Sequence, residues 1–177
     1  MKVAVIGDIH GTTKFLECYK NIQETDSDVE KIIVLGDWFD PYVDIDFDIM
    51  IERYNEFVKI WKSDDRIISI LGNHDLAGYI ISNDSTNRTL RFGKMRKQLR
   101  EVIEPNLPES YLTYKIGDYM FSHAGVSQDW LNDIGEIPDC NYVDDIMNCK
   151  KGWTEDELTD ICAFYPYDWS NSGDNIH

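Results

Sequence analysis

Asp, Asn and His residues directly follow three short apolar segments of this chain, and these residue types suit metal binding. The apolar segments 3–6, 32–35 and 67–71 run into GlyAspIleHisGly (7–11), GlyAspTrpPheAsp (36–40) and GlyAsnHisAsp (72–75). Short β-branched runs that end in glycine are typical of buried strands in a largely parallel sheet. The carboxyl ends of such strands form the binding crevice of an open α/β sheet, so we expect five side chains to converge there: Asp8, His10, Asp37, Asn73 and His74. The pattern predicts a metal site.

The chain has only four histidines, and three of them follow predicted strands. His10 and His74 lie in the motifs above, His123 follows the apolar segment 119–122, and His177 is the last residue. A mixed set of Asp, His and Asn ligands suits Mn, Fe, Zn or Ni better than Mg or Ca. One histidine after a strand is more often an ordinary hydrogen-bonded loop residue, but three together favour a metal site.

Four motifs occur along the chain in the order AspIleHisGly, GlyAspTrpPheAsp, GlyAsnHisAsp and SerHisAlaGly, with gaps of helix length between them. In this order they resemble the successive motifs of the calcineurin-like metallophosphoesterase superfamily, over about residues 2–127. The GlyAspIleHisGly and PheSerHisAlaGly wording is most similar to its phosphoprotein-phosphatase and dinucleoside-tetraphosphatase branches. The resemblance implies an α/β fold, an αββα sandwich of two sheets with flanking helices, and hydrolysis of phosphate esters.

The resemblance also implies two divalent transition metal ions, with Mn favoured and Fe, Zn or Ni as alternatives. Asp8 and His10 would hold the first metal, and Asp37 would bridge both metals. Asn73 and His123 would hold the second metal. Such a dinuclear site polarises the phosphoryl group and turns a shared water into a hydroxide that attacks phosphorus in line.

His74 and Asp40 are the pair to which the resemblance assigns acid catalysis. His74 would protonate the leaving oxygen as the general acid, and Asp40 would orient it and keep it charged. Asp40 could instead cap a turn before Pro41. We expect Asp75 to orient a loop backbone rather than to react.

The chain departs from the family pattern at three places. The late Gly-His-x-His motif, whose histidines complete the two metal sites, has no counterpart in residues 124–177. Pro41 and Leu71 stand where the phosphatase branch carries phosphate-binding arginines, which argues against protein phosphatase activity. We therefore expect residues 1–177 to form a single metallophosphoesterase-like domain, truncated at its C-terminus. The missing ligands would lie beyond residue 177, come from a partner or be absent.

Length and charge narrow the class of protein. The 177 residues are enough for one domain with a buried core. A net charge of −16 opposes general nucleic-acid binding, which relies on Lys and Arg. No apolar run approaches the roughly 18 residues of a membrane span. Four cysteines without CxxC spacing, and an N-terminus without a signal-peptide pattern, lead us to expect reduced thiols and a cytoplasmic protein.

Two amphipathic helices are predicted between the first three strands, over residues 13–24 and 46–62. A basic amphipathic helix is predicted over 89–103, and the cations of residues 88–100 either guide an anionic substrate or form an ordinary solvated helix face. Residues 111–122 predict a β-hairpin with a two-residue turn, which begins a second sheet. A second sheet of one hairpin is incomplete and leaves an exposed edge, through which the chain could self-associate.

Two functions stay open on the sequence alone. The first, which we favour, is a metal-dependent phosphoesterase that acts on a small phosphorylated substrate, either a phosphomonoester or a nucleotide-type phosphoanhydride. The second is a catalytically impaired binding or scaffold protein on the same fold, which the missing late histidines suggest. The overall acidity argues against a nuclease, and a scaffold would have no reason to keep an acid–base pair. Also against a scaffold is the joint retention of five site residues: Asp8, His10, Asp37, Asn73 and His74.

Overall fold

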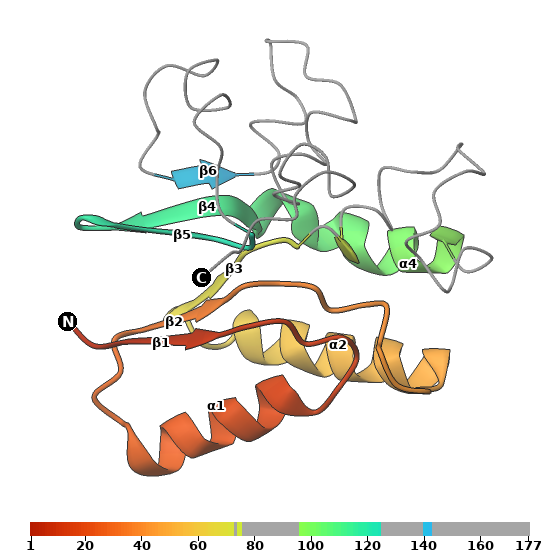
Figure 1. Ribbon diagram of the computed structural model, residues 1–177, viewed down its shortest axis with the longest axis horizontal. Helices are drawn as coiled ribbons and strands as arrows, with labels where there is room; N and C mark the ends of the chain where they lie inside the picture. Colours follow the sequence, from red (N-terminus) through yellow and green to blue (C-terminus); the bar gives the residue numbers. More distant parts are fainter. Residues whose placement is uncertain (73, 76–95, 125–139, 143–177) are drawn as a thin grey trace, which may run out of the picture.

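The N-terminal part of the protein contains a three-stranded parallel sheet (Figure 1). The computed structural model describes residues 1–72, 74–75, 96–124 and 140–142. The sheet contains β1 (Val3–Ile6), β2 (Lys31–Val34) and β3 (Ile67–Ser69) in this order, and both strand pairs are parallel. The apolar runs therefore predicted all three strands correctly, to within two residues at each end.

Two helices connect the parallel strands, as the amphipathic patterns predicted. α1 (Lys14–Thr25) follows β1, and α2 (Phe47–Trp61) follows β2. Asp46 caps α2, because its side chain accepts a hydrogen bond of 2.9 Å from the N–H of Asp48. The helix therefore begins directly after the loop that follows β2, which contains two of the predicted site residues.

A second, antiparallel sheet contains β4 (Tyr111–Ile116), β5 (Tyr119–Ser122) and β6 (Cys140–Tyr142), in the order β5-β4-β6. The predicted hairpin is confirmed. Its two-residue turn contains Gly117, whose φ of 57° lies in the left-handed region that favours glycine.

The expectation that the second sheet consists of one hairpin is wrong. β6 pairs with β4 on the side opposite β5, so β4 is a central strand. No sequence pattern predicted β6, because three residues are too few to show the alternation that marks a strand. Self-association, which was inferred from that bare edge, stays a prediction.

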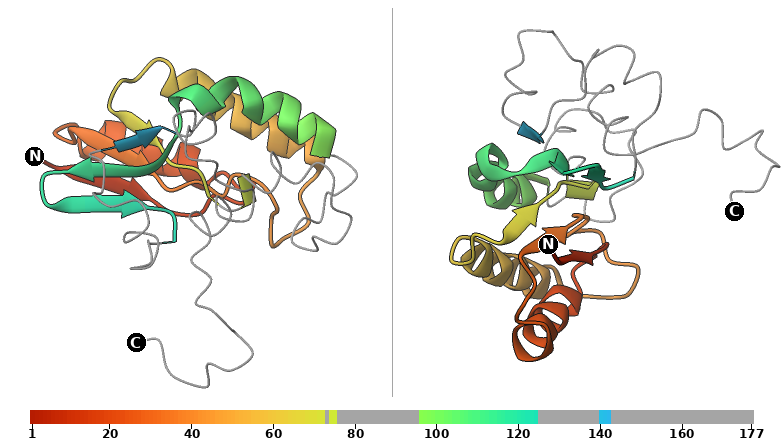
Figure 2. Two further views of the ribbon diagram at one scale, coloured as in Figure 1. Left: turned by 90° about the horizontal axis from the view of Figure 1, so that it is seen from above. Right: turned by 90° about the vertical axis from the view of Figure 1, so that its left-hand side faces the viewer.

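The parallel sheet is covered on both faces (Figure 1, Figure 2). α1 and α2 lie against one face, and the antiparallel sheet lies against the other. Residues of β2 alternate between the two: Ile32 and Val34 belong to the core beside the helices, whereas Ile33 packs with Tyr114 and Phe121 of the antiparallel sheet. The predicted α/β fold with two sheets is confirmed.

α4 (Arg96–Ile103) packs beside α2 and continues into a 3₁₀ helix, η2 (Glu104–Glu109). Its Leu99 and Ile103 are fully buried in the helix-side core. Residues 89–95 of the predicted basic helix, and the side chains of all six cations in 88–100, lie outside what the structure describes. No helix in the described part of the chain is long and apolar enough to cross a membrane.

Candidate metal centre

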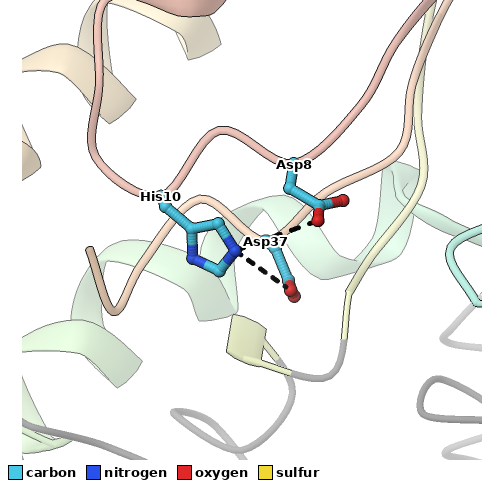
Figure 3. Close-up of side chains that lie close together, drawn as sticks. All are labelled: Asp8, His10 and Asp37. Atoms are coloured by element: carbon cyan, nitrogen blue, oxygen red, sulfur yellow. Dashed lines mark ion pairs between the residues drawn. The ribbon is translucent and has the colours of Figure 1, made fainter. Parts of the chain in front are cut away.

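The loops that follow β1 and β2 run side by side and bring three predicted ligands together. The backbone N–H of His10 donates to the carbonyl oxygen of Asp37 at 2.6 Å, and the N–H of Gly11 donates to that of Trp38 at 2.7 Å. Asp8, His10 and Asp37 each offer a ligand atom, and these atoms all lie within 4.8 Å of one another (Figure 3). The convergence expected at the strand ends is therefore present in the backbone itself.

Asp37 lies at the centre of the cluster. Its Oδ2 is 3.2 Å from Nε2 of His123, 3.7 Å from Nε2 of His10 and 4.0 Å from Nε2 of His74. Its other oxygen, Oδ1, accepts a hydrogen bond of 3.0 Å from the backbone N–H of His74. One buried carboxylate thus faces histidines from the ends of three different strands.

Three predicted site residues adopt a left-handed backbone conformation that residues other than glycine rarely take. The φ angles of His10, Asp37 and Asp40 are 46°, 53° and 62°. Each such residue costs on the order of 1 kcal/mol and persists only where its surroundings enforce it. Trp38 supplies part of that enforcement: it is 3% exposed and stacks on Phe57 at 4.0 Å between ring centroids.

Two glycines allow the loops after β2 and β3 to touch. A Cβ on Gly36 would overlap the backbone nitrogen of Gly72 and would lie 2.7 Å from the carbonyl oxygen of Ile70. A Cβ on Gly72 would overlap Oδ1 of Asp37 and would lie 2.6 Å from its backbone nitrogen. Cβ atoms do not come this close to backbone atoms in real proteins. A larger residue in place of Gly36 or Gly72 would therefore force these loops apart and displace Asp37.

The side chain of Asp75 binds the backbone of both loops, as the sequence led us to expect. Its Oδ2 accepts hydrogen bonds from the N–H groups of Asp37 (2.8 Å) and Gly72 (3.0 Å), and its Oδ1 accepts one from Trp38 (2.7 Å). Burial and the charge of Asp37 raise the pKa of the Asp75 carboxyl to about 7, and the backbone donors act in the opposite direction.

The ring of His10 is prepared to bind a metal ion. Its Nδ1 donates to the carbonyl oxygens of Phe39 and Asp40, each at 3.0 Å, so Nε2 carries the lone pair. This buried Nε2 has no hydrogen-bond partner among the described residues, and it faces Oδ2 of Asp8 at 4.0 Å and Oδ2 of Asp37 at 3.7 Å. Two atoms that each lie about 2.1 Å from one ion are at most about 4.2 Å apart, so both distances from His10 fit a shared divalent metal ion.

A comparison with protein families agrees with this geometry. The sequence model of the family described as calcineurin-like phosphoesterase matches residues 1–174. The chain belongs to this family. Its members are metal-dependent hydrolases of phosphoester bonds, and the Asp8, His10 and Asp37 group is a candidate site for the metal. A comparison with curated proteins found no match.

His123, which the resemblance to calcineurin-like phosphoesterases made a predicted ligand, reaches Asp37 from the second sheet. Its Nδ1 donates to the carbonyl oxygen of Leu35 at 2.7 Å, which turns Nε2 toward Asp37. Burial alone would lower the pKa of His123, but the hydrogen bond to Asp37 and the charge of Asp37 raise it to about 9. Burial acts to raise the pKa of Asp37, but His123 and His74 hold it below its usual range. Without metal, the pair is therefore ionised.

His74 and Asp40 face each other beside the cluster. Nδ1 of His74 lies 3.0 Å from Oδ2 of Asp40, which is an ion-pair distance, although the ring N–H is not aligned well enough for a hydrogen bond. This contact leaves Nε2 of His74 as the ring atom nearest Asp37. The pairing inferred from the resemblance is present in the structure. Asn73, the other predicted ligand, and His177 lie outside the described residues.

Three residues beside the calcineurin-like phosphoesterase site had no role in the sequence-based prediction. The ring of Tyr42 lies 4.3 Å from that of His10 between centroids. Nη1 of Arg53 donates to the carbonyl oxygen of Gly11 at 2.6 Å, and Nζ of Lys14 donates to that of Asp8 at 3.1 Å. Of the three, only Tyr42 had a signal in the sequence, because it is two residues from Asp40.

Proposed function

We propose that this chain hydrolyses a small phosphate ester or nucleotide-type phosphoanhydride, with two divalent metal ions and with His74 as the general acid. The observation that carries this proposal is the position of Asp37, whose Oδ2 faces Nε2 of three histidines at 3.2–4.0 Å. A buried carboxylate with imidazole nitrogens on several sides is suited to act as a metal ligand together with those histidines.

Asp8 and His10 would hold one ion, and Asp37 would be shared between the two. His123 would hold the other ion together with Asn73. Carboxylate, imidazole and amide ligands suit Mn²⁺, and they also suit Fe, Zn or Ni. When bound, such ions polarise the phosphoryl oxygens and lower the pKa of a water molecule so that it can attack phosphorus.

His74 would supply the proton that the leaving group needs. Its Nδ1 lies 3.0 Å from the carboxylate of Asp40, so Nε2 is the ring nitrogen that faces the cluster, and in the protonated ring it is the donor. As the bond between phosphorus and the ester oxygen breaks, this proton passes to that oxygen and the alcohol leaves neutral. Asp40 stabilises the imidazolium before transfer and fixes the direction of the ring.

Charge at the edge of the site favours a small anionic substrate. The ammonium group of Lys14 lies 3.1 Å from the carbonyl oxygen of Asp8, beside a residue that would bind metal. A cation at this position, together with the ions, would offset the carboxylates of Asp8 and Asp37 when a phosphate dianion approaches. The positions that carry arginine in the phosphatase branch are Pro41 and Leu71, and both are buried.

Hydrolysis of p-nitrophenyl phosphate by the purified chain tests the proposal. We expect turnover with Mn²⁺ that stops when a chelator is added and returns when excess Mn²⁺ is restored. Asp37→Asn should abolish turnover, whereas Asp44→Asn, an exposed carboxylate on the same loop, should leave it unchanged. A folded chain that binds Mn²⁺ but shows no turnover would instead support the scaffold alternative.

A further inference from the structure

Tyr42 presents an exposed aromatic ring beside a buried residue of the metal centre. Its ring centroid lies 4.3 Å from that of His10, and the two rings are tilted by 53°. His10 is 5% exposed, whereas Tyr42 is 75% exposed. Part of the Tyr42 ring therefore covers a predicted ligand, and most of its surface is open to solvent at the same place.

The core does not explain this position. Six other aromatic residues of the loop and of the two connecting helices pack against one another: Phe15, Trp38, Phe39, Tyr54, Phe57 and Trp61. Each of them is buried or nearly so, in contrast to Tyr42. An aromatic side chain gains free energy when its ring is covered, so the exposed ring of Tyr42 is available to stack on a ligand at the site.

Tyr42 and the proposed acid, His74, are both neighbours of the His10 ring. The ring of His10 contacts Tyr42 at 4.3 Å and His74 at 5.3 Å between centroids. Asp40, which faces His74, is two residues from Tyr42 on the same loop. A group that leaves phosphorus with a proton from His74 would depart within reach of the Tyr42 ring.

We propose that Tyr42 stacks on a flat aromatic ring in the leaving group, and that it makes the enzyme prefer aromatic phosphate esters over aliphatic ones. This role presupposes the hydrolytic activity proposed above, and it adds a substrate class to it. Offset or tilted contacts between rings are the geometry that aromatic pairs prefer, and a nucleobase or an aryl group offers the same face.

Binding of two phosphonates, which cannot be hydrolysed, tests the stacking without turnover. Calorimetry of the Mn²⁺-loaded chain should give a lower Kd for phenylphosphonate than for methylphosphonate. Tyr42→Ala should weaken phenylphosphonate binding about tenfold, the size of loss that removal of a stacking side chain causes, and should leave methylphosphonate unchanged. Tyr42→Phe should keep the preference, because the ring and not the hydroxyl makes it. Val43→Ala, the neighbouring exposed residue, is the matched control.

Two results would overturn the stacking role. One is equal binding of both phosphonates by the wild-type chain. The other is a Tyr42→Ala variant that loses affinity for both phosphonates equally, or for Mn²⁺ itself, since either loss means that the ring only shields His10. Turnover of p-nitrophenyl phosphate in the same preparations separates the two proposals: hydrolysis without discrimination refutes the stacking alone, and discrimination without hydrolysis refutes the catalytic function alone.

A third titration identifies the source of the aromatic ring. An adenosine phosphonate that binds more tightly than phenylphosphonate, with its advantage lost in Tyr42→Ala, supports the stacking role and assigns it to nucleobases. An adenosine phosphonate that binds more weakly, while phenylphosphonate keeps its preference, supports the role and assigns it to compact aryl groups.

Discussion

The side chain of Asp75 holds the backbone of Asp37, because its Oδ2 accepts the Asp37 N–H at 2.8 Å in the protein interior. That bond fixes Asp37 in the left-handed region, with φ at 53°, and this conformation turns its own carboxylate toward the histidines. The residue that would bind metal is thus positioned by a second, buried carboxyl. Positioning of this kind commonly accompanies metal sites.

Asp75→Asn should therefore destabilise the fold and weaken metal binding. One carbonyl oxygen can serve the N–H groups of Asp37 and Gly72, but the new amide then faces the N–H of Trp38, which loses its acceptor. A buried unsatisfied donor costs about 1–3 kcal/mol. Urea denaturation at pH 8 should show this loss, and Asp118→Asn in the exposed hairpin turn should show none. Equal stability of both variants would contradict the role given to Asp75.

Gly36→Ala should cost far more than Gly117→Ala, although both glycines have positive φ. At Gly117 nothing lies within 4 Å of the added methyl, so only the backbone penalty of about 1 kcal/mol remains. At Gly36 the methyl would meet the backbone of Gly72 and of Ile70, which cannot move without shifting β3. We expect a loss of about 3 kcal/mol or more in the free energy of unfolding. Similar midpoints in thermal denaturation would show that the loops can separate.

The sequence was sufficient to predict the parallel sheet and the approach of Asp8, His10 and Asp37 to one another. Apolar runs of four or five residues can hardly form helices, and each one led into Gly and a polar residue, so β1, β2 and β3 and their polar ends were predictable. The contact between His74 and Asp40 was also expected, because the resemblance named them as a pair; the two side chains lie 3.0 Å apart.

Other features depend on tertiary packing and left no trace in the sequence. β6 is three residues long and gains its pairing from β4, not from its own composition. The left-handed conformations of His10 and Asp40 follow from hydrogen bonds between loops, whereas sequence preferences would favour glycine there. The contact between Tyr42 and His10 depends on the path of the loop before α2, which no local pattern determines.

His74→Asn should reduce turnover in a way that depends on the leaving group. Alkyl alcohols are poor leaving groups and need the proton from His74, so their phosphates should lose about 10²- to 10⁴-fold in kcat. p-Nitrophenolate leaves without a proton, and its ester should lose much less. Asp40→Asn should follow the same trend with a smaller loss. If His74→Asn leaves kcat unchanged for both esters at saturating Mn²⁺, His74 is not the acid.

Metal binding should release a proton from His123. Asp37 raises the pKa of His123 to about 9 in the metal-free chain, so the ring is protonated at pH 7 and must become neutral to bind metal. The stabilising pair with Asp37 is complete below about pH 6.5, the ordinary value, and is lost as the pH rises through 9. Mn²⁺ affinity should therefore increase from pH 6 toward pH 9.

Calorimetry in buffers of different ionisation enthalpy measures the proton directly. The wild-type chain should release more protons per bound Mn²⁺ than His123→Asn at pH 7. Equal proton release by the two proteins would show that the released proton does not come from His123.

A single titration of the chain with Mn²⁺, in which bound metal and hydrolysis of p-nitrophenyl phosphate are followed together, tests the central claim most directly. The position of Asp37 between His10 and His123 predicts two bound ions and turnover that rises as the second ion binds. Asp37→Asn should lose both the second ion and the activity. A folded chain that binds no Mn²⁺, or that hydrolyses the ester equally well in chelator, would contradict the account.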